Sequence, residues 1–253
     1  MKKTLFTCLI IVLAATLISA DTTASKKFNL SPAAQQDMFF ESGYGYGGIK
    51  LLGGLAFSNI GYSRDPGVGI DQYQSSKMGF LGGIGFEMGS RIAFEIDVMY
   101  MQKGVKFKGE GSDATSGYNG SFDVKAYFDE VSVPVLIKLR LMPGSTPYIL
   151  GGGEIAYMVS TKADYDVTDG DTGQSYSGTE DLGDAENLNK LDYGAVFGAG
   201  FEMNTGSIPF FVEGRYYLGM ANLFKNTDTT PSGVQDDDWV RTRAIVVLIG
   251  AKF

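Results

Sequence analysis

Residues 77–108 alternate between apolar positions and positions that carry small or acidic side chains. The apolar phase consists of Met78, Phe80, Ile84, Phe86 and Met88 before a Gly89-Ser90 pair, and of Ile92, Phe94, Ile96, Val98 and Tyr100 after it. The opposite phase consists of Gly79, Gly83, Gly85, Glu87, Ala93, Glu95 and Asp97. Because successive side chains of a strand point to opposite faces, this pattern predicts a β-hairpin with one apolar face and one face of glycines and carboxylates.

Six further segments repeat this alternation, so the chain is expected to form eight strands. We expect these strands at 46–57, at the two arms of the hairpin, and at 125–141, 147–160, 192–203, 208–219 and 239–253. An arm of about ten residues is long enough for a tilted strand to cross a bilayer.

The connections between these strands are short and long in turn. Tight turns are expected at Gly89-Ser90, 142–146 and 204–207, which are rich in turn-forming residues. The connections at 58–76, 109–124, 161–191 and 220–239 are long, polar and acidic. Short periplasmic turns and long extracellular loops are typical of barrels in the bacterial outer membrane. The pattern therefore predicts an all-β, eight-stranded, antiparallel up-and-down transmembrane β-barrel.

Alternation alone does not decide whether the apolar face points to lipid or to the interior. A soluble, ligand-binding barrel would turn that face inward. Glycines on the opposite face favour the membrane alternative, because the interior of an eight-stranded barrel is only wide enough to be filled by side chains. The C-terminal strand, which ends on Phe253, also resembles the signal by which outer-membrane proteins are recognised for insertion.

Aromatic residues of the apolar face gather near the two ends of the predicted strands. Such girdles mark the two interfaces of a membrane. The girdle on the long-loop side is predicted to contain Tyr100, Tyr127, Tyr157, Tyr193, Tyr216 and Trp239. The girdle on the short-turn side is predicted to contain Phe86, Phe94, Phe201, Phe210 and Phe253.

The polar face carries charges that a narrow lumen would bury. A buried charge without a partner is costly, so we expect these side chains to form a polar network that fills the lumen. Its predicted members are Lys50, Glu87, Glu95, Asp97, Glu130, Lys138, Arg140, Glu154, Glu202, Glu213 and Arg215. Because the carboxylates in this set outnumber the cations, some are expected to be protonated or bridged by water.

The N-terminus has the composition of an export signal. Lys2 and Lys3 precede an apolar run that ends at Ser19-Ala20, as in a cleaved secretory signal peptide over 1–20. Cys8 lies too early in that run for lipoprotein processing, so the mature chain is expected to lack cysteine. Residues 21–45 are polar and are expected to form a periplasmic lead-in, with a short helix that begins at Ser31-Pro32, before the barrel at 46–253.

Charge and composition exclude several classes of function. The formal net charge of −8 argues against nucleic acid as a partner. The chain has no histidine, the usual general base near neutral pH, and a Ser-His-Asp arrangement cannot be built. Glu95 and Asp97 are chemically able to act as an acid–base pair, but pairing with interior cations is favoured. We expect no enzymatic activity, no catalytic or metal site and no cofactor.

Three local features leave questions for the structure. The acidic segment 164–171 resembles a calcium loop, but its spacing does not fit an EF-hand, so a solvated loop is favoured over a specific calcium site. Arg241 and Arg243 either face lipid at the membrane interface or lie in a loop before a later strand start. Pro134 lies mid-strand, where it removes a ladder hydrogen bond, and predicts a local bulge or register break.

The order and spacing of the strand sequences resemble one known family. These sequences include GGIGFEM (82–88), EVSVPVLIKLR (130–140), DYGAVFGAGFE (192–202) and EGRYYLGMANL (213–223). They are similar to those of the PorT-like outer-membrane β-barrel proteins of Bacteroidota, over residues 46–253. The resemblance implies a location in the bacterial outer membrane and a barrel architecture, without a shared ligand or catalytic residues.

Taken together, these features predict a structural or interaction protein that works through its acidic extracellular loops. The expected partners are outer-membrane lipid, lipopolysaccharide and other envelope proteins. The alternatives are an accessory component of an envelope secretion or transport system and, in another class, the soluble ligand-binding barrel. The oligomeric state is left open by the sequence.

Overall fold

The computed structural model describes residues 47–62, 73–113, 118–142, 146–182, 188–203, 208–224 and 239–253. The chain divides into two units after Gly45. The predicted signal peptide and lead-in, residues 1–45, lie outside the described residues. The described residues contain no helix that is long and apolar enough to cross a membrane.

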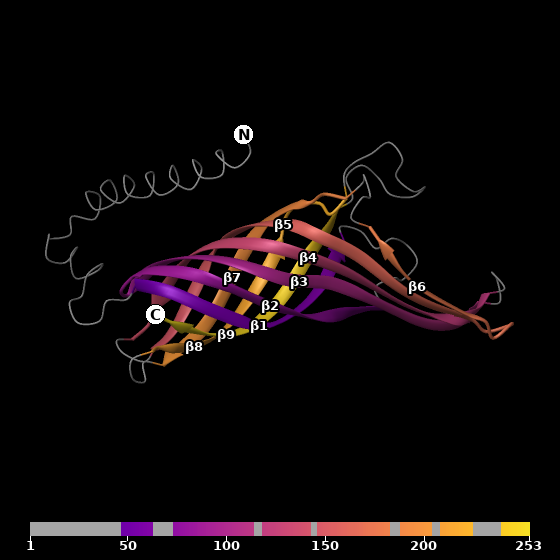
Figure 1. Ribbon diagram of the computed structural model, residues 1–253, viewed down its shortest axis with the longest axis horizontal. Coiled ribbons are helices and arrows are strands. Elements are labelled where there is room, and N and C mark those ends of the chain that lie inside the picture. Colours follow the sequence, from indigo (N-terminus) through magenta and orange to yellow (C-terminus); the bar gives the residue numbers. More distant parts are fainter. Residues whose placement is uncertain are drawn as a thin grey trace, which may run out of the picture. The chain divides into compact units, whose positions relative to one another are not determined.

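The described residues form nine strands, each antiparallel to its neighbours (Figure 1). They are β1 (Gly47–Tyr62), β2 (Gln74–Gly89), β3 (Ile92–Asp113), β4 (Tyr118–Arg140), β5 (Thr146–Asp169), β6 (Ser175–Asp181), β7 (Leu191–Met203), β8 (Phe210–Gly219) and β9 (Val240–Lys252). The strand order is β4-β3-β2-β1-β9-β8-β7-β5-β6, and β4 also pairs with β5. Eight strands therefore close into a ring, and β6 lies outside it, paired only with β5. The predicted eight-stranded antiparallel barrel is confirmed.

Hydrogen bonds between the first and last strands close the barrel. The Ile49 amide donates to the Phe253 carbonyl (3.1 Å), and the Phe253 amide donates to the Ile49 carbonyl (2.9 Å). At the turn between β2 and β3, Gly89 has a φ of 128°, which glycine adopts readily because it has no Cβ. Closure leaves the eight ring strands without a free edge.

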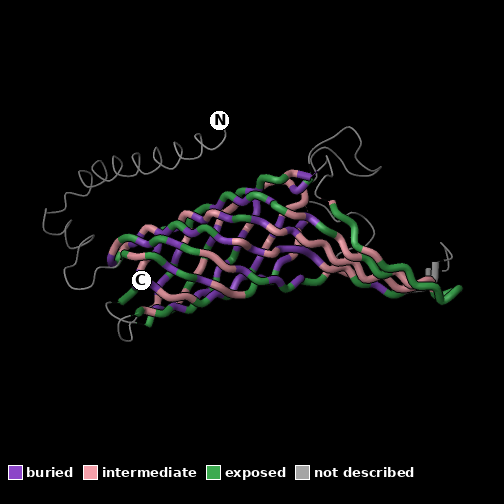
Figure 2. Tube along the Cα trace, viewed as in Figure 1, coloured by how far each residue is buried: buried purple, intermediate pink, exposed green. Residues whose placement is uncertain are grey.

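The apolar face points outward. Ile96 and Val98 are 38% and 46% exposed, whereas Glu95 and Asp97 beside them are fully buried. The same alternation of exposed and buried positions follows the strands around the barrel (Figure 2). In a soluble protein this apolar surface would be exposed to water. The arrangement therefore suits a membrane and excludes the soluble barrel with an apolar interior.

The prediction of loops is wrong for two segments, because strands continue through them. β3 and β4 extend through most of 109–124, and β5 and β6 occupy most of 161–182. The ladder pairs Phe107 with Val124 and Val124 with Tyr165, well past the barrel rim. These segments carry polar residues on both faces, so they lack the one-sided pattern by which a strand in a membrane is recognised, although backbone pairing holds them extended.

The predicted irregularity at Pro134 is also wrong. Pro134 pairs in register with Glu154 on β5, and the register between β3 and β4 is the same before and after it. The β3–β4 ladder is interrupted at Val133 and Pro134, which fits the missing N–H of proline. The bulge lies instead between Asp129 and Glu130, where β5 has one extra residue. A proline can therefore be accommodated within a closed ladder by the loss of pairing to one neighbour.

The start of β9 decides between the two alternatives for Arg241 and Arg243. The strand begins at Val240 and pairs Arg241 with Gly61 and Arg243 with Asn59 of β1. Both arginines are therefore strand residues, in the phase that continues as the exposed Ile245, Val247 and Ile249.

Candidate functional site

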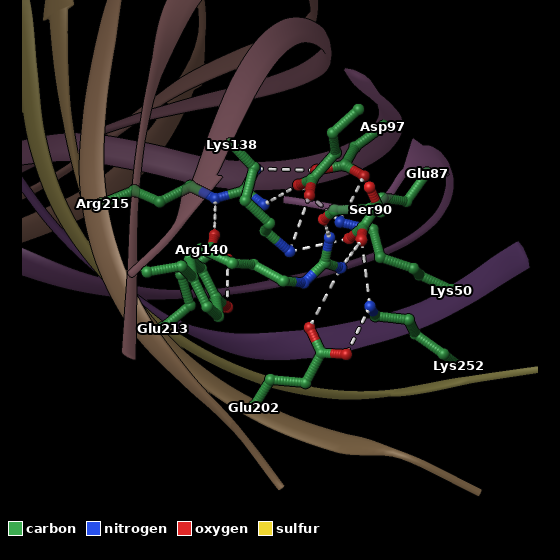
Figure 3. Close-up of polar contacts among 12 residues, drawn as sticks. Lys50, Glu87, Ser90, Asp97, Lys138, Arg140, Glu202, Glu213, Arg215 and Lys252 are labelled. Atoms are coloured by element: carbon green, nitrogen blue, oxygen red, sulfur yellow. Dashed lines mark hydrogen bonds and ion pairs between the residues drawn. The ribbon is translucent and has the colours of Figure 1, made fainter. Parts of the chain in front are cut away.

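The half of the lumen next to the short turns holds ten buried charged side chains from seven strands (Figure 3). Five are carboxylates and five are cations. The carboxylates are Glu87, Glu95, Asp97, Glu202 and Glu213, and the cations are Lys50, Lys138, Arg140, Arg215 and Lys252. We call this set the inner network. Its charges balance, so the lumen can bury them without a net charge.

Glu87 is the centre of one half of the inner network. It accepts from Lys138 Nζ at 2.7 Å and from Lys252 Nζ at 3.0 Å, and it pairs with Arg140. Lys252 also bridges to Glu202 at 2.7 Å. A carboxylate from β2 is thus bound by cations from β4 and β9, which lie on opposite sides of it in the ring.

Arg215 is the centre of the other half. Its Nη2 lies 2.6 Å from Glu95 Oε1 and its Nη1 lies 2.7 Å from Asp97 Oδ2, while its Nε pairs with Glu213. Planar guanidinium groups suit several carboxylates at once, because their N–H donors lie in a fixed fork. Lys50 shares Glu95 and Asp97 with Arg215, so these two carboxylates each have more than one cation.

A second group of charges lies nearer the extracellular mouth, and we call it the outer cluster. Lys103 lies 2.7 Å from Glu130 and 3.5 Å from Glu154, and Ser132 donates to Glu154 at 2.7 Å. Asp192 accepts a hydrogen bond from Thr242 at 2.7 Å. Three buried carboxylates here face one lysine, so the excess of interior acid expected from the sequence is localised in the outer cluster.

Apolar and aromatic side chains occupy the space between the charges. One cluster of buried residues, including Met99, Leu136 and Leu248, lies within the ring. Aromatic rings also contact the lysines: Lys138 Nζ is 4.1 Å from the centre of the Tyr148 ring and Lys50 Nζ is 5.3 Å from that of Phe211. Such contacts stabilise a desolvated cation.

A second apolar cluster lies at the extracellular mouth. It contains Val105, Phe128 and Met158 together with Leu188 and Leu223 from the connections. The Leu223 amide donates to the Val240 carbonyl at 2.8 Å, and the Asn189 amide donates to the Leu223 carbonyl at 2.9 Å. The connections therefore pack against the strands over the mouth.

All eleven residues predicted for the interior are buried in the structure. Nine of them lie in the inner network, and Glu130 and Glu154 lie in the outer cluster. Glu213, in the inner network, also accepts a hydrogen bond from the Tyr148 hydroxyl at 2.7 Å. The predicted network omitted Lys103, Asp192 and Lys252. Lys103 has the same phase as Glu95, Asp97, Met99 and Met101, and Lys252 shares the polar phase of Thr242, so phase was an available signal for both. Asp192 lies near the start of its strand, where phase is least certain.

Beyond the rim, β3, β4, β5 and β6 continue as a four-stranded projecting sheet (Figure 1). Side chains brace it on one face: Lys106 pairs with Asp123 at 3.0 Å, and Thr179 donates to Asp164 at 2.8 Å. Hydrogen bonds from the Thr179 and Tyr127 hydroxyls lower the pKa of Asp164 below its usual value. Asp169 has a lowered pKa as well, because the Thr172 and Asp171 amides donate to it.

One edge of the projecting sheet is formed by β6, and the other by β3 beyond Phe107. In the strand order β6 is terminal and pairs only with β5. Residues 161–181 contain six carboxylates and one lysine, and Tyr165 and Tyr176 are exposed on them. Within the described part of the chain, no group of three or more acidic side chains converges so as to hold a metal ion. The acidic segment is thus a solvated edge strand and hairpin.

Comparison with known families assigns the chain. A family model described as "Outer membrane protein beta-barrel domain" matches residues 33–225. The chain belongs to this family. A comparison with curated proteins gives no match.

Solved structures of other outer-membrane barrels are similar to this outer-membrane β-barrel. Ail, the attachment invasion locus protein of Yersinia pestis solved with the heparin analogue sucrose octasulfate, is 19% identical, with 81% of this chain and 99% of that chain covered and a TM-score of 0.36. Neisserial surface protein A is 14% identical, with 81% of this chain and 97% of that chain covered and a TM-score of 0.35. OprG from Pseudomonas aeruginosa is 15% identical, with 83% of this chain and 98% of that chain covered and a TM-score of 0.41.

In an outer-membrane β-barrel, the exposed belt of this structure faces lipid. The predicted girdle residues lie on the outward face at both ends of the strands: Phe86, Phe210 and Phe253 are exposed beside the short turns, and Tyr157 and Tyr193 are exposed toward the mouth. Among the other members, Phe201 and Tyr216 are also exposed, and Phe94, Tyr100, Tyr127 and Trp239 are half-buried. Their role at the two interfaces stays a prediction.

We expect replacement of Arg215 to destabilise the barrel strongly. In Arg215→Leu, Glu213 loses its guanidinium, and Glu95 and Asp97 keep only lysines. Removal of one partner from a buried ion pair costs about 3–5 kcal/mol. The free energy of unfolding in lipid vesicles, measured by urea titration, tests this expectation.

Two further variants sharpen the Arg215 experiment. Arg91→Leu alters an exposed arginine of the β2–β3 turn and should leave stability within about 0.5 kcal/mol. Adding Glu213→Gln to Arg215→Leu should restore part of the loss, because one uncompensated charge is removed. A stability of Arg215→Leu equal to that of Arg91→Leu would contradict a paired inner network.

We expect the projecting β5–β6 hairpin to loosen in acid. The folded hairpin favours ionised Asp164, so its stabilising contribution is complete above the usual aspartate pKa of about 4 and is lost as the pH falls through the lowered folded value. Deuterium uptake over 162–181, corrected for intrinsic exchange, should rise below about pH 4. Asp164→Asn should raise uptake at pH 7 and flatten its pH dependence. An unchanged profile in that variant would contradict the role of Asp164.

Proposed function

We propose that this outer-membrane β-barrel is a non-conducting scaffold that presents its projecting sheet to a protein partner. The observation that carries the proposal is the continuation of β3, β4 and β5 beyond the rim in one ladder, extended by β6. Loops on a rigid support are common binding sites. A sheet anchored in a membrane barrel is more rigid still, so it presents its edge in a fixed orientation.

The edge strand β6 suits recognition by strand addition. An edge strand offers backbone N–H and C=O groups that an extended segment of another chain can pair with. The exposed Tyr176 on β6 and Tyr165 on β5 supply apolar area beside these groups. The partner segment is therefore an extended one that lies along β6.

The charge of the edge defines the chemistry of the partner. With six carboxylates against one lysine in 161–181, an extended segment rich in lysine and arginine is attracted and an acidic one is repelled. Such an attraction weakens as salt screens it. Affinity for the partner should fall at high ionic strength.

The proposal includes a filled lumen. The inner network, the outer cluster and the two apolar clusters together supply the buried side chains of the interior. An eight-stranded barrel is only wide enough for side chains to fill. On this proposal, the barrel anchors the sheet and does not transport solutes.

Planar-bilayer recording tests the filled lumen. The purified barrel should give no steady single-channel conductance at neutral pH. Glu130→Ala with Glu154→Ala, which removes two of the three carboxylates of the outer cluster and leaves the inner network intact, should remain closed as well. A steady, large conductance of the unmodified protein would overturn the non-conducting part of the proposal.

Photo-crosslinking in intact cells tests the interaction surface. A crosslinking amino acid at Tyr176 should capture a discrete partner, whereas the same amino acid at Met142, exposed beside a short turn, should not capture it. Asp166→Asn with Glu180→Gln, two exposed carboxylates, should reduce the yield at Tyr176 several-fold, since the edge loses two of its charges. Equal capture from the two positions would contradict a specific partner of β6.

The identity of the captured protein bears on the narrower assignment. The strand sequences that resemble PorT-like barrels support an accessory role in an envelope secretion or transport system. Capture of a component of such a system at Tyr176 would support this role, and capture of a protein outside it would favour a separate interaction function.

A further inference from the structure

Two arginines lie on the lipid-facing surface of β9 near its extracellular end. Arg241 and Arg243 occupy the phase that continues as the exposed Ile245, Val247 and Ile249. Arg243 precedes the periplasmic end of the strand by about ten residues, which in a strand tilted by ~40° rise about 25 Å, the height of the apolar band of such barrels. Both guanidinium groups are therefore at the outer boundary of the hydrocarbon.

The two guanidinium groups are held in place by uncharged neighbours. Arg241 lies over the ring of Trp239, with 4.4 Å between the guanidinium carbon and the ring centre. The Arg243 guanidinium lies where a side chain of Gly61 would be, so the glycine leaves room for it. Within the described part of the chain, neither Nε has a hydrogen-bond partner and neither arginine makes an ion pair.

An open cleft of about 380 Å³ lies beside Arg243. Its lining is mostly polar: Asn59, Tyr62, Gln74, Ser75 and Ser76 take part, with Ile60 and Gly61. The Gln74 side chain donates to the Ile60 carbonyl at 2.7 Å, which fixes one wall. The cleft offers hydroxyl and amide groups next to a cation and above an apolar surface.

We propose that Arg241, Arg243 and this cleft form a binding site for the headgroup of a phosphorylated glycolipid of the outer leaflet. Each part of the surface matches one part of such a lipid. Guanidinium groups bind phosphate through paired N–H donors, the polar cleft takes sugar hydroxyls, and the outward side chains of β9 contact the acyl chains. The site is separate from the projecting sheet and does not depend on its function.

Trp239 is the only tryptophan of the chain, so its fluorescence reports on the site directly. The full-length barrel in phosphatidylcholine vesicles is titrated with a bisphosphorylated diglucosamine glycolipid. We expect a saturable change in Trp239 emission. Arg241→Gln with Arg243→Gln should weaken binding at least about tenfold, as expected for the loss of two charge-assisted hydrogen-bonding groups.

Matched variants separate the site from general charge effects. Arg91→Gln removes an exposed arginine at the periplasmic turn and should bind normally. Arg241→Lys with Arg243→Lys keeps both charges but loses the planar fork, so its affinity should lie between those of the parent and the glutamine variant. All variants are first shown to be folded by the heat-dependent mobility of the barrel in gel electrophoresis. Binding by the glutamine variant equal to that of the parent overturns the proposal.

Other ligands identify which chemistry is recognised. The dephosphorylated glycolipid should bind at least tenfold more weakly, on the same charge-assisted basis, and equal binding overturns a phosphate site. Phosphatidylglycerol that binds as tightly as the glycolipid overturns the role of the cleft, and inorganic phosphate that saturates the signal at micromolar concentration overturns a lipid ligand.

Asp236, Asp237 and Asp238 precede Trp239 in the sequence. Their replacement by asparagine should preserve or strengthen binding, and loss of binding would contradict a site built on the two arginines.

Discussion

The pairing of charges inside the barrel is the constraint on which the rest of the structure depends. The interior of an eight-stranded barrel is only wide enough for side chains to fill it, and a buried charge without a partner is costly, so a charge that points inward needs a partner. Glu87 and Arg215 each contact several opposite charges from different strands. These contacts connect β2, β3, β4, β8 and β9 across the lumen, so the network links strands that the backbone ladder joins only indirectly.

The distribution of charge in the lumen is uneven. The inner network contains equal numbers of carboxylates and cations, whereas the outer cluster contains three carboxylates and Lys103. The excess acid lies closer to the extracellular mouth, below an apolar cluster that includes Leu188 and Leu223. The charges therefore balance in the inner network, which is the part of the lumen farthest from the extracellular solvent. The imbalance is confined to the outer cluster near the mouth.

Beyond the membrane, the requirements on a strand change. Inside the barrel, one face must be apolar and the other must satisfy its charges, whereas the projecting sheet meets water on its faces and carries cross-strand pairs such as Lys106–Asp123 and Thr179–Asp164. Within the described residues, its outermost strand β6 keeps a free edge, as does β3 beyond Phe107, where the pairing with β2 ends. The same ladder thus provides a closed anchor and an open surface, while the arginines of β9 mark the boundary between the two environments.

The sequence by itself determined the ring and the direction of its faces. A period of two over eight segments identifies lipid-facing residues such as Ile96 and buried ones such as Glu95, because each residue's face follows from its parity. It also identified eleven interior polar residues, all of which are buried. Parity does not say which charges meet, since partners such as Arg215 and Asp97 are far apart in the chain and are brought together only by ring closure.

The tertiary structure decided three features that the pattern of residues did not contain. The projecting sheet exists because backbone pairing extends past the membrane, where the apolar alternation that identifies a strand is no longer required. Pro134 stays in register because it loses its partner on only one neighbouring strand, β3, and keeps Glu154 as its partner on β5. Lys103 pairs with Glu130 and Glu154 because the stagger of the strands brings these residues side by side, and stagger is a property of the closed ring and not of any one strand.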